Sequence, residues 1–173
     1  ISESLKKNGA ELAFTYQNDK LKDRVEKLAA ECDSDIIMPC DVSEDGSIKN
    51  MLDQLSGKWN EFDIIVHSLA FAPREELEGN YVEKTTKEGF ISAHSISSYS
   101  LLELCKEAKS MLKGSSPSVI SLSYLGAVRG MPNYNYMCVE KASIEANVRY
   151  MAYAMGEDNI IADLEKNWAV VAE

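Results

Sequence analysis

The stretch that decides the fold is residues 121–141, which read SLSYLGAVRGMPNYNYMCVEK. It opens at the end of an apolar, β-branched run at residues 118–122, which predicts a buried strand. After Pro132 a second pattern begins, with an interval of three or four residues that predicts a helix. The residues with this spacing are Met137, Lys141, Ile144, Val148 and Met151. The stretch is therefore expected to be a strand–loop–helix unit.

Two side chains suited to proton chemistry lie in the second half of this unit. Tyr134 and Lys141 are seven residues apart, which is two turns of helix, so both are expected on one helix face. A phenol beside an ammonium group suggests a proton donor next to a charge that tunes and orients it. Tyr124, just past the strand, can face the same space. The spacing alone also fits a packed tyrosine and a solvated lysine, so both interpretations stay open.

The whole stretch resembles the bacterial enoyl-acyl-carrier-protein reductases of type II fatty-acid synthesis, which are relatives of the short-chain dehydrogenases. That family carries a tyrosine, a second tyrosine ten residues later and then, after six further residues, a lysine. These positions are Tyr124, Tyr134 and Lys141 here. Ordinary short-chain dehydrogenases place the lysine four residues after the tyrosine, where this chain has Cys138. Within the superfamily, the spacing therefore favours the enoyl reductases over the ordinary short-chain dehydrogenases.

The resemblance covers nearly all of residues 1–160 but has two departures beside the lysine. Cys138 and Glu140 stand where the family usually has glycine and alanine. Glu140 is expected about 100° around the helix from Lys141, so it is expected to point elsewhere. If it turned inward, its carboxylate would raise the pKa of Lys141 and compete with the ribose hydroxyls of a cofactor.

Strands alternate with helices along the whole chain. The sequence predicts strands at residues 10–16, 35–39, 62–66 and 118–122, and the helices between them are about ten residues or longer. This alternation predicts βαβ units and a parallel sheet. The expected fold class is α/β, a doubly wound sheet of the Rossmann type, in a single dinucleotide-binding domain over residues 1–173.

That domain is expected to be incomplete in two places. A dinucleotide fold normally begins with a strand and a glycine-rich turn, which are predicted to precede Ile1. Residues 155–160 lead toward another buried strand, but residues 161–166 favour a helix. Since the family has a strand and a substrate-covering loop there, the resemblance implies that such a segment belongs around residues 160–161. The polypeptide is therefore expected to be longer than 173 residues.

Ligands of open α/β sheets bind beyond the carboxyl ends of the strands. The residues that follow the predicted strands are therefore expected to line one crevice with Tyr134 and Lys141. The resemblance implies contacts of Gln17 with the adenosine ribose and of Asp41 and Val42 with the adenine. It implies further contacts of Leu69 near the nicotinamide and of Ala72 near the acyl substrate. Helix capping for Asp41, and loop packing for Leu69 and Ala72, are the alternative interpretations.

The choice of cofactor rests on Gln17. A 2′-phosphate favours a nearby arginine or lysine, whereas a free ribose hydroxyl favours a hydrogen-bond acceptor. A neutral amide at the end of the strand therefore favours NADH over NADPH, although Lys20 and Lys22 are close in sequence.

Composition excludes several classes of partner. The formal net charge is −10, so nucleic acid and anionic membrane are poor partners. The four cysteines form no CxxC motif, and reduced thiols in a cytoplasmic protein are expected. No metal is expected either, because the calcium-loop-like run from Asp41 to Gly46 has Leu52 at the position of the bidentate glutamate.

The resemblance implies reduction of a trans-2-enoyl thioester on acyl-carrier protein by NADH. Tyr134 would stabilise the charge on the thioester oxygen, Lys141 would hold the cofactor ribose, and Tyr124 would have a supporting role. The long helices expected at residues 89–112 and 133–155 resemble those through which the family forms homotetramers. Two alternatives stay open: a ketoreductase-like short-chain dehydrogenase, and a catalytically dead subunit retained for assembly or regulation.

Overall fold

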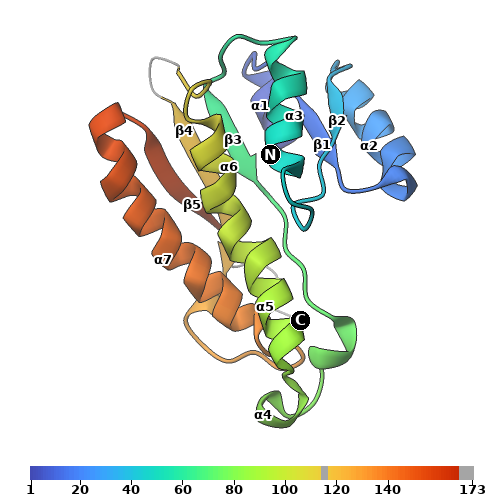
Figure 1. Cartoon of the computed structure of the whole chain (residues 1–173), viewed down its shortest axis with the longest axis vertical. Helices are drawn as coiled ribbons and strands as arrows, with labels where there is room; N and C mark the ends of the chain where they lie inside the picture. The colour runs from blue at the N-terminus through green and yellow to red at the C-terminus, as the bar shows by residue number, and fades with distance from the viewer. Residues whose placement is uncertain (114–116, 168–173) are drawn as a thin grey trace. The chain divides into compact units, whose positions relative to one another are not determined.

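Parallel strand pairing with helical connections organises the chain, as the sequence predicted (Figure 1). The structure, a computed structural model, describes residues 1–113 and 117–167. The chain divides into two units, Ile1–Trp59 and Asn60–Glu173, with one sheet in each. The assignment of all 173 residues to one domain stays a prediction.

The first unit holds the helices α1 (Ser2–Lys7), α2 (Asp19–Glu31) and α3 (Ser47–Ser56) and two short strands. Strand β1 (Phe14–Tyr16) pairs in parallel with β2 (Ile37–Pro39), so that Tyr16 lies opposite Pro39. Gly9 follows α1 with a φ of +89°, a left-handed conformation that glycine adopts without strain and that ends the helix. The buried apolar side chains of this unit are Ala29, Cys32, Met38, Ile48, Met51, Leu52 and Leu55.

The second unit is built on a parallel sheet in the order β3 (Ile64–His67), β4 (Ser118–Tyr124) and β5 (Ile161–Asn167). Ile64 lies opposite Ser118 in one pairing, and Ser118 lies opposite Ile161 in the other. Strand β4 is therefore the central strand of this sheet. Its side chains alternate between fully buried residues, such as Val119, and half-buried ones.

The prediction of a helix at residues 161–166 is wrong, because this segment is strand β5. The apolar residues Ile161 and Leu164 are three positions apart, which fits a helix in isolation. In the fold, however, β5 pairs with β4 over all seven of its residues, and this pairing overrides the local pattern. A late strand is therefore present after residue 160, whereas the substrate-covering loop predicted at this point stays a prediction.

Helices of the second unit are α4 (Tyr81–Lys84), α5 (Lys87–His94), α6 (Ser100–Ala108) and α7 (Met137–Met155). Helices α5 and α6 form one rod, green to yellow in Figure 1, in which a π-helical turn at Ser95–Tyr99 separates them. The single helix predicted at residues 89–112 is therefore correct in place but interrupted by that turn, and its last helical residue is Ala108. Helix α7 runs beside this rod (Figure 1).

The inward face of α7 confirms the spacing predicted for it. Met137, Lys141, Ile144, Val148 and Met151 are all buried, together with Glu140 and Glu145. Among the described residues, β1 and β3 each have a strand partner on one side only. The strand and glycine-rich turn expected before Ile1 stay a prediction.

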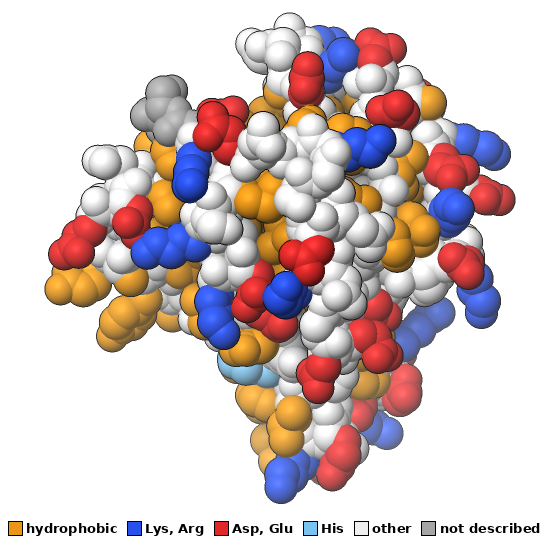
Figure 2. Space-filling model, turned by 45° about the horizontal axis from the view of Figure 1, so that its top comes forward, with side chains coloured by type: hydrophobic (Ala, Val, Ile, Leu, Met, Phe, Trp, Pro, Cys, Tyr) orange, Lys and Arg blue, Asp and Glu red, His pale blue; other side chains and the backbone are white. Residues whose placement is uncertain are grey.

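The surface carries mixed charges with hydrophobic side chains between them on the face seen in Figure 2. Among residues 1–113 and 117–167, Tyr150 and Tyr153 on α7 are the most exposed aromatic residues, at 76% and 85% of their full area. Within the described part of the chain, no helix combines the length and apolar character needed to cross a membrane.

Candidate active site

Three consecutive residues at the carboxyl end of β4 each contact the segment that forms α7 and the turn before it. The Lys141 ammonium donates a hydrogen bond to the Leu122 carbonyl over 2.8 Å. The Ser123 hydroxyl donates to the Glu145 carboxylate over 2.7 Å. The Tyr124 ring packs edge-on against the Tyr134 ring, with 4.8 Å between ring centroids. The predicted catalytic residues Tyr124, Tyr134 and Lys141 therefore meet at one end of one strand.

Tyr134 lies in the turn before α7, so the prediction that it shares a helix face with Lys141 is wrong. Helix α7 begins at Met137, whose amide donates to the Tyr134 carbonyl over 2.9 Å. The neighbours Asn133 and Asn135 both have positive φ values, 56° and 30°, which a helix does not accommodate. Asparagine tolerates this conformation, and the turn it forms brings the Tyr134 ring to Tyr124.

Both phenols of the site are held in the protonated form. Burial, followed by the nearby Cys138, raises the pKa of Tyr134 above its ordinary value of 10.0. Burial also raises the pKa of Tyr124, with further contributions from Cys138 and Tyr134. At neutral pH each hydroxyl therefore keeps its proton and can donate it in a hydrogen bond.

Gly126 makes room for the Tyr124 ring. A Cβ atom placed on Gly126 would lie about 2.4 Å from the ring, closer than a Cβ atom comes to a non-bonded atom in real proteins. The glycine after β4 is thus required by the position of a site residue. Its backbone sits in the short 3₁₀ turn Leu125–Ala127 that follows the strand.

Lys141 and Glu140 point to different neighbours, as the helix geometry predicted. Burial lowers the pKa of Lys141 from 10.5, and its ammonium contacts the Leu122 carbonyl. Glu140 is fully buried, and its carboxylate lies 2.8 Å from Nδ1 of His94 on α5. Burial raises the pKa of Glu140, and His94 opposes that rise. The carboxylate next to the lysine in sequence therefore contacts α5.

His67 closes β3 as a buried, neutral imidazole. Its Nε2 lies 2.9 Å from the Ser100 hydroxyl, which itself donates to the Ile96 carbonyl and so must accept from the imidazole. Its Nδ1 is then an acceptor, 3.3 Å from the Ser121 hydroxyl. Burial, followed by the Lys141 charge, lowers the pKa of His67 from 6.5 to about 4.

Acid should therefore destabilise this unit through His67. Unfolding returns His67 to its ordinary pKa, so the unfolded state binds one more proton between about pH 6.5 and about pH 4. The stabilisation is complete above pH 6.5 and is lost as the pH falls, by about 1.4 kcal/mol per pH unit. Urea unfolding at about pH 7 and about pH 4.5 measures it, with His67→Gln as the non-titrating comparison. Equal losses in the two proteins would show that another group titrates.

In the first unit, strand pairing brings two of the predicted cofactor-binding residues together. The Gln17 amide donates to the Asp41 carboxylate over 3.0 Å. The Ser43 amide and hydroxyl donate to the other carboxylate oxygen, over 2.9 Å and 2.6 Å. Partial burial raises the pKa of Asp41, but these hydrogen bonds outweigh it and leave the pKa below 3.8. Asp41 is thus an ionised acceptor that also orients Gln17, and Val42 is half-buried beside it.

The remaining predicted residues lie in the segment that follows β3. Leu69 and Ala72 are both half-buried there. Between them, the Phe71 backbone is bound by Ser97 from the π-helical turn, through its amide at 2.9 Å and its carbonyl at 3.0 Å. The predicted contacts of Leu69 with a nicotinamide and of Ala72 with an acyl group stay predictions.

Sequence reasoning missed a set of buried polar residues that hold these elements. Each of them has less than a tenth of its area exposed. They are five serines and one glutamate: Ser97, Ser98, Ser100, Ser121, Ser123 and Glu145. A signal was present in residues 95–100, where four serines fall within six positions of an otherwise amphipathic helix. Serine inside a helix indicates side chains that bond to something other than water.

Parallel strands joined by helices, with two tyrosines and a lysine at the end of one strand, define a Rossmann-type protein of the short-chain dehydrogenase kind. A family model described as "Enoyl-(Acyl carrier protein) reductase" matches residues 1–163. The chain belongs to this family.

Individual relatives agree with that assignment. The chain is 54% identical over 160 residues to the NADH enoyl-[acyl-carrier-protein] reductase FabI of Escherichia coli, covering 92% of this chain and 61% of that protein. It is 49% identical over 160 residues to FabI of Haemophilus influenzae, with the same two coverages of 92% and 61%. The chain thus spans about 61% of the length of these curated relatives.

Solved structures give the same result. The NADH enoyl-[acyl-carrier-protein] reductase of Aquifex aeolicus has a TM-score of 0.91 at 41% identity, covering 98% of this chain and 65% of that one. The reductase of Anaplasma phagocytophilum, solved in complex with NAD, has a TM-score of 0.90 at 36% identity and covers 95% of this chain and 62% of that one. The predicted family and fold class are confirmed.

Proposed function

We propose that this protein reduces trans-2-enoyl thioesters carried on acyl-carrier protein, with NADH as the reductant. The observation that carries the proposal is the meeting of Tyr124, Tyr134 and Lys141 at the carboxyl end of β4. Membership of the enoyl-(acyl carrier protein) reductase family and the activity for which the relatives are named support it. The overall reaction consumes one enoyl thioester, one NADH and one proton and yields the saturated thioester and NAD⁺.

The tyrosine pair supplies the electrostatic part of this reaction. Bound NADH supplies a hydride, which adds to the β carbon of the enoyl group. Negative charge then develops on the thioester oxygen, and a hydrogen-bond donor placed there stabilises it. Tyr134 is assigned this role by its match to the second tyrosine of the family, and its phenol carries the proton that such a donor needs. Tyr124 supports it, since its ring fixes that of Tyr134.

Lys141 is assigned to the cofactor ribose. An ammonium group has three N–H donors, and the Leu122 carbonyl accepts one of them. The others are available to ribose hydroxyls. Since the carbonyl fixes the Lys141 head group, little side-chain entropy remains to be lost when the cofactor binds.

The residues of the first unit fit NADH. Gln17 brings a neutral amide, and the Asp41 carboxylate to which it donates is ionised. A carboxylate in that position accepts hydrogen bonds from hydroxyl or amino groups and repels a 2′-phosphate. Gln17 is assigned to the adenosine ribose, and Asp41 and Val42 to the adenine. Leu69 is assigned to the nicotinamide side and Ala72 to the acyl group.

NADH should be preferred over NADPH, and Gln17→Arg should move the ratio of the two kcat/KM values toward NADPH. The guanidinium group would add a partner for the 2′-phosphate and would also pair with Asp41. Steady-state rates with both cofactors measure the ratio, and Gln54→Arg, a change of the same kind at another exposed site, is the matched control. Equal efficiency with both cofactors in the unmutated protein would contradict the assignment.

Neither alternative is favoured. A ketoreductase-like dehydrogenase would carry its lysine at position 138, which is Cys138 here. The matched relatives are named enoyl reductases, which also argues against a non-catalytic subunit. Oxidation of NADH with a crotonyl thioester and with an acetoacetyl thioester separates the three functions. The proposal predicts turnover with the crotonyl substrate, and turnover with only the acetoacetyl substrate, or with neither, would contradict it.

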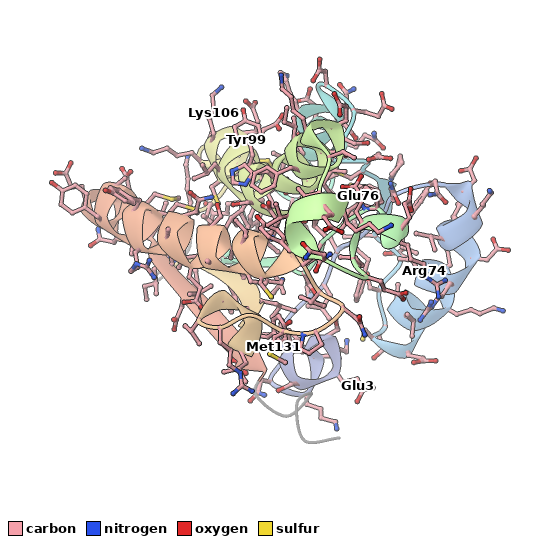
Figure 3. The ribbon with its side chains drawn as sticks, turned by 90° about the horizontal axis from the view of Figure 1, so that it is seen from below. Glu3, Arg74, Glu76, Tyr99, Lys106 and Met131 are labelled. Carbon is pink, nitrogen blue, oxygen red and sulfur yellow. The ribbon has the colours of Figure 1, made fainter. Side chains whose placement is uncertain are left out.

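We further propose that the protein works as a homotetramer in the cytoplasm. The α5–α6 rod and α7 expose apolar side chains beside two grooves of about 360 Å³ and about 480 Å³. Tyr99 and Lys106 project from the rod along this face (Figure 3). Four free cysteines suit a reducing compartment.

Charge placed on this face should dissociate the assembly. Tyr150→Glu combined with Tyr153→Glu puts two carboxylates where apolar contact is proposed, so the protein is expected to sediment as a smaller species. Sedimentation velocity measures this, and Val82→Glu, at an equally exposed apolar position on α4, is the control. An unchanged sedimentation coefficient in the double variant would contradict assembly through α7.

A further inference from the structure

The π-helical turn Ser95–Tyr99 connects three elements of the second unit through buried serine hydroxyls. Ser97 binds the backbone of Phe71 in the segment after β3. Ser98 binds Ser143 and Asn147 on α7, over 2.7 Å and 2.9 Å. Ser100, the first residue of α6, binds His67 at the end of β3. A π-helical turn inside a longer helix commonly marks a functional position.

Ser97 holds Phe71 by both of its backbone groups. Its hydroxyl accepts from the Phe71 amide over 2.9 Å and donates to the Phe71 carbonyl over 3.0 Å. These two contacts replace the pair of hydrogen bonds that a neighbouring strand would give a residue. The Phe71 side chain is itself exposed, so packing of that side chain does not fix the segment. Ser97 has none of its own area exposed to water.

The far end of the same segment has a second anchor. Glu76 (Figure 3) accepts from the amide and hydroxyl of Thr86, over 2.9 Å and 2.8 Å, at the beginning of α5. Its backbone carbonyl accepts from the side-chain amide of Asn135 over 2.7 Å. Asn135 directly follows Tyr134, so the segment between Phe71 and Glu76 is tied at one end to the π-helical turn and at the other to the turn that carries Tyr134.

We propose that Ser97 is a positioning residue for the acyl substrate: it fixes the backbone beside Ala72 so that the acyl group binds in one place relative to Tyr134. This inference rests on the proposed function, which assigns Ala72 to the acyl group. Ser97 does not touch the reacting atoms, and its effect on the reaction passes through the Phe71 backbone. Because Phe71 is adjacent to Ala72 and two residues from Leu69, the effect of Ser97 falls on binding of the enoyl substrate more than on binding of the cofactor.

Ser97→Ala tests the proposal, with Ser98→Ala as the matched control. Both changes delete one fully buried hydroxyl from the same turn, but the Ser98 hydroxyl binds α7. Ser97→Ala is expected to raise the KM for a crotonyl thioester about tenfold, which corresponds to about 1.4 kcal/mol. The kcat and the NADH dissociation constant should stay within about twofold. Ser98→Ala should leave the KM for the thioester unchanged.

Hydrogen exchange without substrate provides a separate measurement. Ser97→Ala should speed exchange of the Phe71 amide and its neighbours, whereas Ser98→Ala should not. Unchanged exchange at Phe71, an unchanged KM for the thioester, or equal rises of KM in both variants would overturn the proposal. If the unmutated protein turns over no enoyl thioester, the proposed function fails and the role of Ser97 in substrate binding fails with it. Faster exchange would then show only that Ser97 holds the segment.

Discussion

Replacement of Tyr134 by phenylalanine is expected to lower kcat roughly 10²–10³-fold, the usual effect of losing one donor to a developing oxyanion. The aromatic ring stays, so its edge-on contact with Tyr124 is kept. Only the hydroxyl, which is the proposed donor, is lost. The NADH dissociation constant should therefore remain nearly unchanged, and the loss should fall on the chemical step.

Steady-state rates on a crotonyl thioester measure this effect, and fluorescence titration measures cofactor binding. Tyr81→Phe deletes a hydroxyl from a half-exposed tyrosine on α4 and is the matched control. A kcat that stays within about twofold in Tyr134→Phe would remove Tyr134 from the mechanism. Equal losses in both variants would point to a general effect on folding.

Replacement of Lys141 by alanine should weaken NADH binding and turnover together. The Lys141 side chain is buried, and its ammonium group is fixed by the Leu122 carbonyl. Leu122 lies two residues before Tyr124, at the carboxyl end of β4. Losing the proposed hydrogen bonds to the ribose should raise the NADH dissociation constant about 10–100-fold, since a hydrogen bond to a charged group contributes about 1.5–3 kcal/mol.

Fluorescence titration with NADH measures the effect on binding directly. Lys58→Ala, at an exposed position just after α3, controls for the loss of one positive charge. An unchanged dissociation constant in Lys141→Ala would show that Lys141 has only a structural contact with β4. The combined loss of binding and turnover distinguishes this variant from Tyr134→Phe, which should affect turnover alone.

Much of the fold could be predicted because its elements carry strong local patterns. The apolar run at residues 118–122 lies within the central strand β4, and the spacing from Met137 to Met151 is the buried face of α7. Strand β5 could not be predicted in this way. Its residues satisfy a helical spacing, and only the neighbouring edge of β4 makes them a strand.

The site was predictable in its members and less so in its geometry. Tyr124, Tyr134 and Lys141 do lie at one end of β4, as predicted. Tyr134 gets there through a turn with two left-handed asparagines, and not by sharing a helix face with Lys141, as the seven-residue spacing had suggested. Gln17 and Asp41 meet because Tyr16 and Pro39 are paired across two strands, a contact between residues distant in sequence. The π-helical turn was missed, although the four serines within residues 95–100 were a compositional signal for it.

The contacts of Glu140 and Cys138, near Lys141 in the sequence, also depend on residues distant along the chain. Helix geometry alone indicated that Glu140 would point away from Lys141. That its carboxylate would lie fully buried against His94 required the packing of α5 on α7. Cys138 faces the tyrosine pair and contributes to the raised pKa of both phenols.

Transfer of hydride from NADH to the β carbon of an enoyl thioester is tested most directly with a crotonyl thioester and NADH that carries deuterium at both C4 positions of the nicotinamide. Mass spectrometry and NMR then locate the label in the product. We expect a butyryl thioester carrying one deuterium at the β carbon for each NADH oxidised. Deuterium at the α carbon, or NADH left unoxidised in the presence of the thioester, would contradict the proposed reaction.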